Sequence, residues 1–144
     1  MRSRDAGPLR WVFFDVGGTL GRAMATPGGL RLEPFASSPA LLEMMRSTLG
    51  LRVGVLSNTP DGMNTQEFRA LLDRAGLLAL LDSTAVITSR DAGASKPDPR
   101  VYAYAAERVG VPVGQCLYIG ENPVEVEGAR KAGMAGLVKP VPAT

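Results

Sequence analysis

An aspartate stands where an apolar run gives way to glycines near the start of this chain. The residues from Trp11 to Phe14 are aromatic or β-branched and predict a buried strand, and Asp15 follows them directly. Gly17 and Gly18 allow a sharp turn there and leave backbone N–H groups free to face an anion. A carboxylate at the carboxyl end of such a strand is placed to act as an exposed nucleophile. Asp-x-Gly is also common turn chemistry, so these residues alone equally allow Asp15 to cap a turn.

Three further predicted strands also end in polar residues. The run 53–56 ends in Ser57 and Asn58, the run 84–88 leads into a loop that carries Lys96 before a proline-started helix, and the run 116–119 ends in Gly120 and Glu121. Aspartate, serine, lysine and glutamate therefore follow four strands in that order. A recurring placement of this kind indicates one shared site at the strand ends.

These residues resemble the haloacid dehalogenase (HAD) superfamily of aspartate-nucleophile hydrolases, most of which are phosphatases. The resemblance covers nearly the whole chain. It rests on four motifs in the family's order: Asp15 with Thr19, Ser57, Lys96 in Lys-Pro-Asp-Pro, and Gly120-Glu121 followed by Glu125 and the run 128–134. It implies a three-layer, Rossmann-like α/β fold and hydrolysis of a phosphomonoester through an aspartyl-phosphate.

The resemblance also implies a role for each of these residues, with Mg²⁺ as the cofactor. The expected catalytic residues are Asp15, Ser57 and Lys96; the expected phosphate-binding groups are Ser57, Asn58, Lys96 and Gly18; the expected metal ligands are Asp15, the Gly17 carbonyl and Glu121. Thr19 is expected to orient its loop by side-chain hydrogen bonds. Taken alone, Ser57 also fits a helix cap, and Lys96 a solvated loop lysine.

Two residues depart from the family's pattern. Most HAD phosphatases carry a second aspartate two residues after the nucleophile, which acts as general acid and base, and Gly17 can do neither. Glu121 stands where aspartate is usual, so its carboxylate reaches roughly 1.5 Å further, and Mg²⁺ tolerates misplaced ligands poorly. Glu125 stands one residue short of the second acidic position of the fourth motif and equally fits a solvent-facing helix charge.

These departures leave two functions open. The first is a Mg²⁺-dependent phosphatase, and the alternative is a catalytically weak or inactive HAD-fold module that binds a protein partner or a phosphorylated ligand. A dehalogenase fits less well, because those relatives use a cap and additional residues after the nucleophile. A two-component receiver domain carries its phosphorylated aspartate on a later strand.

The elements that must position these residues alternate along the chain. Segments with helical spacing of apolar residues separate the predicted strands, and a last short strand is expected at 137–139. Right-handed crossovers then place helices on both faces of a five-strand parallel sheet and gather the strand ends along one rim.

The segment 21–35 has no sustained periodicity and predicts a flexible hairpin or flap beside the site. It is too short for a helical cap domain, so the chain resembles a capless member of the family. An open site implies a phosphorylated substrate that is bulky or macromolecular, or a homo-oligomer in which a neighbouring copy covers the site.

Composition excludes several other classes. The 144 residues suffice for one domain, and we expect a single domain over 1–144 with a frayed lead-in at 1–9. There is no histidine, which excludes Ser-His and Cys-His mechanisms, and Cys116 is expected to pack in a buried strand. The net charge is only +2, and the basic residues are dispersed, so nucleic-acid binding is not expected. No signal peptide or membrane span is visible, and we expect a cytoplasmic protein.

Overall fold

The computed structural model describes residues 7–60 and 62–142 and confirms the predicted α/β fold with a five-strand parallel sheet. The strand order is β5–β4–β1–β6–β7, and every pair in it is parallel. The strands are β1 (Trp11–Phe14), β4 (Arg52–Ser57), β5 (Val86–Thr88), β6 (Cys116–Gly120) and β7 (Ala135–Val138).

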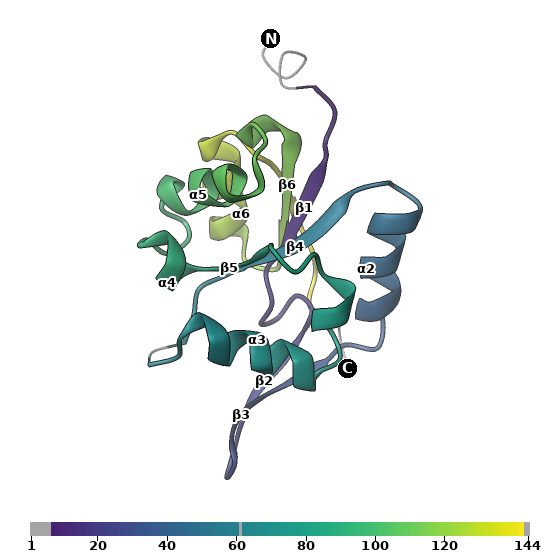
Figure 1. Cartoon of the computed structure of the whole chain (residues 1–144), viewed down its shortest axis with the longest axis vertical. Helices are drawn as coiled ribbons and strands as arrows, with labels where there is room; N and C mark the ends of the chain where they lie inside the picture. The colour runs from purple at the N-terminus through teal and green to yellow at the C-terminus, as the bar shows by residue number, and fades with distance from the viewer. Residues whose placement is uncertain (1–6, 61, 143–144) are drawn as a thin grey trace.

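Helices cover both faces of this sheet and give it three layers (Figure 1). Alternate residues of β1 point to opposite faces, so Val12 and Phe14 belong to one apolar core, and Trp11 and Phe13 to the other. The first core takes the apolar sides of α2 (Ser38–Ser47) and α3 (Thr65–Arg74), and the second takes those of α5 (Pro99–Val109) and α6 (Pro123–Ala132). Both faces of β1 are therefore buried, as the uninterrupted apolar run predicts.

The chain changes direction across the sheet at β1. It first runs outward through β4 to β5 and then crosses over to β6 and β7 on the other side of β1. Ligands of open α/β sheets bind in the crevice outside the carboxyl ends of the strands at such a switch point. Asp15 follows β1 and therefore lies at this switch point.

Local sequence explains where the helices that flank the site begin and end. The Asp98 side chain caps α5 by accepting the Arg100 N–H at 2.9 Å, and the helix ends at Gly110 in the left-handed conformation. The Asn122 side chain caps α6 in the same way. A short helix, α4 (Ser89–Ala92), stands where we predicted only a loop, because the Thr88 hydroxyl accepts the Asp91 N–H.

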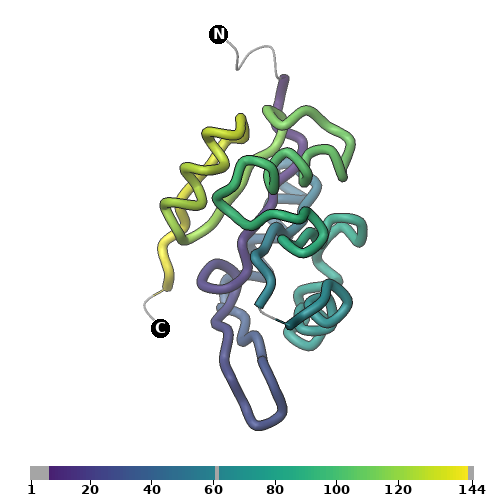
Figure 2. The backbone as a smooth tube through the Cα atoms, turned by 90° about the vertical axis from the view of Figure 1, so that its left-hand side faces the viewer, coloured from purple at the N-terminus to yellow at the C-terminus, as the bar shows by residue number. Residues whose placement is uncertain are grey.

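The segment 21–35 forms the predicted hairpin. Its strands β2 (Gly21–Thr26) and β3 (Gly29–Pro34) pair with each other and join no strand of the main sheet. In both views the hairpin protrudes from the body of the molecule (Figures 1 and 2). Within the described residues it is the whole insertion between the β1 loop and α2, and a separate cap domain is absent from them.

The described part of the chain contains no helix that is both long enough and apolar enough to cross a membrane. Residues 7–9 are exposed, and the rest of the lead-in that we predicted to be frayed lies outside the described residues.

Candidate active site

Asp15 is held at the carboxyl end of β1 by its neighbouring strand. Its backbone N–H donates to the Ile119 carbonyl of β6 at 2.9 Å, and the residue is only 9% exposed. One carboxylate oxygen, Oδ1, accepts a hydrogen bond from Lys96 Nζ at 2.9 Å. The other oxygen has no hydrogen-bond partner among the described residues, so it is available to a substrate or a metal ion.

The loop after Asp15 depends on Gly18. This residue has a φ of 81°, and an added Cβ would lie 2.8 Å from Cγ of Glu121. Its N–H donates to the Gly21 carbonyl at 2.8 Å. The sequence suggested that this N–H faces a phosphate, but in the structure it is already used to close the turn.

Lys96 brings a buried positive charge to Asp15. The lysine side chain is 1% exposed, and Nζ donates to Asp15 Oδ1, to the Leu56 carbonyl at 2.8 Å and to the Tyr118 hydroxyl at 2.7 Å. An ammonium has three N–H donors, so these bonds use all of them. Lys96 is thus not the solvated loop lysine of the alternative interpretation, and its contacts place it on the expected nucleophile.

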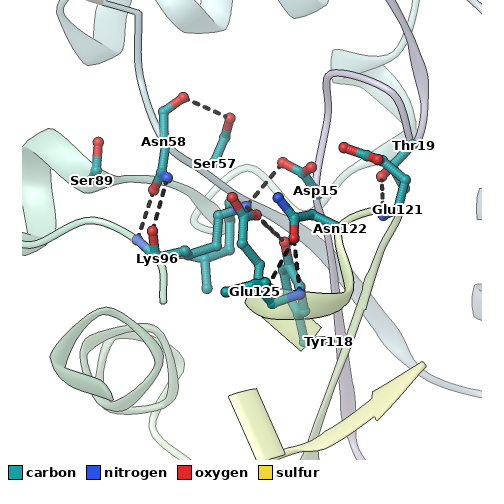
Figure 3. Close-up of polar contacts among 12 residues, drawn as sticks. Asp15, Thr19, Ser57, Asn58, Ser89, Lys96, Tyr118, Glu121, Asn122 and Glu125 are labelled. Carbon is teal, nitrogen blue, oxygen red and sulfur yellow. Dashed lines mark hydrogen bonds and ion pairs between the residues drawn. The ribbon is translucent and has the colours of Figure 1, made fainter. Parts of the chain in front are cut away.

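Asn58 fixes the backbone of Lys96 rather than pointing to an open site. Its Oδ1 accepts the Lys96 N–H at 2.8 Å, and its Nδ2 donates to the Lys96 carbonyl at 3.2 Å (Figure 3). The side chain that we predicted to bind phosphate is therefore engaged in positioning Lys96. The neighbouring Ser57 is buried, and its hydroxyl makes one long hydrogen bond, 3.2 Å to the Asn58 carbonyl, which leaves it free to turn toward a ligand.

Thr19 has the orienting role that we predicted. It is fully buried, and its hydroxyl accepts the Glu121 N–H at 3.0 Å, which ties the β1 loop to the β6 loop. The Glu121 side chain is half-buried and lies against Gly18, with no hydrogen-bond or ion-pair partner among the described residues. A half-buried carboxylate without a partner beside the Asp15 loop fits a ligand for a cation.

The sequence did not predict Tyr118 as a site residue, and it left open whether Glu125 faces the site or the solvent. Glu125 is not a solvent-facing charge, because its Oε1 lies 3.1 Å from Lys96 Nζ and accepts a hydrogen bond from the Tyr118 hydroxyl at 3.2 Å. Figure 3 shows these side chains converging with Asp15. The available signal was the tyrosine itself, since a tyrosine in a fully buried strand must find a partner for its hydroxyl.

The electrostatics of the site favour bound cations and a protonated tyrosine. Asp15, Glu121 and Glu125 bring three negative charges against the single charge of Lys96, a formal excess of two. Burial, reinforced by the neighbouring carboxylates of Asp15 and Glu125, raises the pKa of Tyr118 far above its ordinary value. Tyr118 is therefore a neutral phenol at physiological pH.

The residues present suit Mg²⁺ by donor type and charge. Carboxylate and carbonyl oxygens are the ligands that this ion prefers, and a local excess of two negative charges matches its charge. Within the described residues no three acidic or cysteine side chains lie close enough together to hold a metal ion by themselves. A Mg²⁺ site here would therefore need backbone carbonyl and water ligands besides Asp15 and Glu121.

A large cavity lies away from this site. It measures about 720 Å³ and is lined by hairpin and α3 residues, among them Leu30, Arg31 and Arg74. Asp15 and Lys96 do not line it, so its size is no guide to the site. The chemistry identifies the site at the strand ends instead.

Comparisons with known proteins agree with the fold. A model of the haloacid dehalogenase-like hydrolases matches residues 23–133, a segment that contains Ser57, Lys96 and Glu121 and begins after Asp15. Phosphatase MT3486 of Mycobacterium tuberculosis is 45% identical over 96 residues, 67% of this chain, and (S)-2-haloacid dehalogenase 4A of Burkholderia cepacia is 32% identical over 102 residues, 71% of this chain. The chain spans 41% of the length of each of these two relatives.

A solved structure shows the same fold over most of the chain. An uncharacterized protein from Listeria monocytogenes serotype 4b superposes with a TM-score of 0.76 over 89% of this chain and 76% of its own, at 19% identity.

Proposed function

Because the chain belongs to the haloacid dehalogenase-like hydrolase family, we propose that it is a phosphatase that hydrolyses a phosphomonoester through an aspartyl-phosphate on Asp15. One observation carries the proposal: a buried lysine ammonium lies 2.9 Å from a strand-end aspartate at the switch point of the sheet. This pair supports the proposal, because a carboxylate nucleophile beside a fixed positive charge is what an arriving phosphoryl group requires.

In the first step, Asp15 attacks phosphorus with a carboxylate oxygen. The new O–P bond forms as the ester O–P bond breaks, and the ester oxygen leaves with the bonding electron pair. Gly17 supplies no acid at this point, so the leaving oxygen takes its proton from water or leaves as a stable anion. Substrates with good leaving groups are therefore favoured.

In the second step, water attacks the phosphorus of the aspartyl-phosphate. The Asp15 O–P bond breaks, the carboxylate is regenerated, and the proton of the attacking water passes to the solvent or to the departing phosphate. Lys96 remains hydrogen-bonded to Asp15 Oδ1, which orients the other oxygen toward the substrate. Its positive charge also offsets the negative charge that builds up during both steps.

Mg²⁺ is the cofactor that this site would take, held by Asp15, the Gly17 carbonyl, Glu121 and water. When bound, it would neutralise the repulsion between the phosphate dianion and the carboxylates. The longer side chain of Glu121 supports a weak site, because Mg²⁺ requires ligands at about 2.1 Å. Ser57 is our candidate for the hydroxyl that contacts the phosphoryl oxygens, since its own hydrogen bond is long.

The substrate that fits the fold is bulky or macromolecular. Within the described residues only the β2–β3 hairpin stands between the Asp15 loop and α2, and a cap domain is absent from them. Substrate specificity then depends on the surface around the strand ends, or on a second copy of the chain that covers them.

Phosphate release from p-nitrophenyl phosphate tests the proposal, with Mg²⁺ or EDTA and for wild type and Asp15→Asn. Asp73→Asn, an exposed aspartate on α3, is the matched control. We expect Mg²⁺-dependent turnover that is lost only in Asp15→Asn. Halide release from a 2-haloacid is measured in parallel. Halide release without phosphate release would refute phosphatase activity.

The second candidate is a non-catalytic HAD-fold module that binds a protein partner or a phosphorylated ligand. It is favoured by the absence of an acid at position 17 together with the lengthened carboxylate at Glu121. Calorimetry that detects no Mg²⁺ binding, together with no turnover, would select this function. Metal-dependent turnover would eliminate it.

A further inference from the structure

Tyr118 is a polar side chain at the centre of the buried strand β6. The residue is fully buried, and its hydroxyl accepts a hydrogen bond from Lys96 Nζ at 2.7 Å and donates one to Glu125 Oε1 at 3.2 Å (Figure 3). Both hydrogen-bonding capacities of the phenol are thus directed at charged groups of the site. A phenylalanine would fill the same space in the core, so burial of the ring alone does not account for the hydroxyl.

The Tyr118 hydroxyl lies between the Lys96 ammonium and the Glu125 carboxylate, which attract each other. Lys96 Nζ lies 3.1 Å from Glu125 Oε1 and 2.9 Å from Asp15 Oδ1, so the two carboxylates compete for one ammonium. Nζ has three protons, and the Tyr118 hydroxyl accepts one of them. Because the hydroxyl donates in turn to Glu125, it satisfies that carboxylate without taking the ammonium away from Asp15.

The position of the hydroxyl is itself fixed. The Tyr118 ring packs edge-on against the Tyr102 ring at 5.7 Å between centroids and 78° between planes. The Tyr102 hydroxyl donates to the Glu125 carbonyl at 2.6 Å, which ties α5 to the first turn of α6. An added Cβ on Gly120 would lie 2.9 Å from the Tyr118 oxygen, so the backbone closes off the remaining side.

From this geometry we infer that Tyr118 is a positioning residue, whose hydroxyl directs the Lys96 ammonium to Asp15 and keeps it from pairing with Glu125 alone. The inference rests on the proposed function only in taking Asp15 as the nucleophile. The Tyr118 hydroxyl hydrogen-bonds to Lys96 and Glu125 and not to Asp15, so we assign it no proton-transfer step. Its effect on the reaction is exerted through Lys96.

Proton NMR of the lysine ammonium groups in ¹⁵N-lysine-labelled protein tests the inference without any need for turnover. The chain has only three lysines, and Lys131 and Lys139 are exposed or half-exposed while Lys96 is buried. We expect one slowly exchanging ammonium signal, which Lys96→Arg removes. Tyr118→Phe should shift this signal and raise its exchange rate about tenfold or more, since a hydrogen bond to a charged group is lost. Tyr104→Phe, at a half-buried tyrosine that contacts Arg108 instead, should leave it unchanged.

An unchanged Lys96 signal in Tyr118→Phe, or the absence of a protected ammonium in the wild type, would overturn the inference. If Tyr118→Phe does not fold, Glu125→Gln replaces it, because it weakens the partner to which the hydroxyl donates. This variant is expected to perturb the same signal, and an unperturbed signal counts against the inference.

Kinetics supply the second measurement. We expect Tyr118→Phe to lower kcat on the order of tenfold with little change in KM, and to have no further effect in a Lys96→Met background. Equal effects in both backgrounds would mean that Tyr118 acts on folding and not through Lys96. If the wild type shows no turnover, the proposed function fails while the NMR result still decides the role of Tyr118.

Discussion

Replacing Gly17 by aspartate is expected to restore the general acid and base that this site lacks. The backbone at Gly17 is not in the left-handed region, and an added Cβ would meet no atom within 4 Å. Position 17 is exposed and lies two residues after Asp15. An aspartate can therefore be accommodated without strain, with its carboxyl group near the leaving group of a bound ester.

The size of the gain follows from the leaving group. A positioned acid and base contributes about 100- to 10,000-fold, and we expect the lower end, about 100-fold in kcat, because the exposed position allows water to compete. This factor corresponds to about 2.7 kcal/mol of activation free energy. It applies to sugar and alkyl phosphates, whose alkoxide must be protonated. For p-nitrophenyl phosphate the leaving anion is stable, and we expect a gain of only a few-fold from faster hydrolysis of the aspartyl-phosphate.

The assay compares phosphate release from the two kinds of ester for wild type, Gly17→Asp and Gly17→Asn. Asparagine matches aspartate in size but cannot transfer the proton, so it should remain at the wild-type rate. An equal gain for both variants would show that the side chain acts by packing. No gain for a folded, Mg²⁺-binding Gly17→Asp protein would refute the geometric argument that position 17 faces the leaving group.

Three further predictions concern stability. Lys96→Met leaves the carboxylates of Asp15 and Glu125 without their counter-charge and should cost about 3–5 kcal/mol of unfolding free energy in urea titrations; full stability would mean that the ammonium is dispensable to the fold. Gly128→Ala places a Cβ 2.7 Å from Cβ of Pro97 and should cost about 1–3 kcal/mol by thermal unfolding, whereas an unchanged melting temperature would show that α6 can shift. Hydrogen bonds and the charge of Arg100 lower the pKa of Asp98 from 3.8 to about 2, so its contribution to stability should be complete above pH 4 and be lost as pH falls toward 2. Arg100→Gln should raise the pKa of Asp98 toward its ordinary value and so narrow the pH range over which acid lowers the melting temperature. Identical curves of melting temperature against pH for the two proteins would show that Arg100 does not lower this pKa.

The sequence by itself determined the order of the five strands of the main sheet along the chain and the starts of several helices. Uninterrupted apolar runs predict strands that are buried on both faces, and the structure places β1 at Trp11–Phe14 as expected. Caps such as Asp98 before Pro99 are local signals, and they position α5. Local patterns predicted the bounds of the edge strands of the sheet less reliably, because burial at a sheet edge depends on the elements that pack beside it. The last strand, β7, begins at Ala135, two residues before its predicted start. Strand β5 begins at Val86, two residues after its own predicted start.

Only the tertiary structure decided how the polar residues share the site. Lys96 and Asp15 are 81 positions apart, and their contact depends on the crossover that brings two strand ends together. Glu125 has the same sequence signature whether it faces solvent or Lys96, and the start of α6 at its Asn122 cap sets which side it faces. From the sequence, Tyr118 is expected to be a core residue. Burial of its ring does not reveal which groups its hydroxyl contacts. A local pattern records which groups need a partner, and the packing of distant elements determines which partner each one receives.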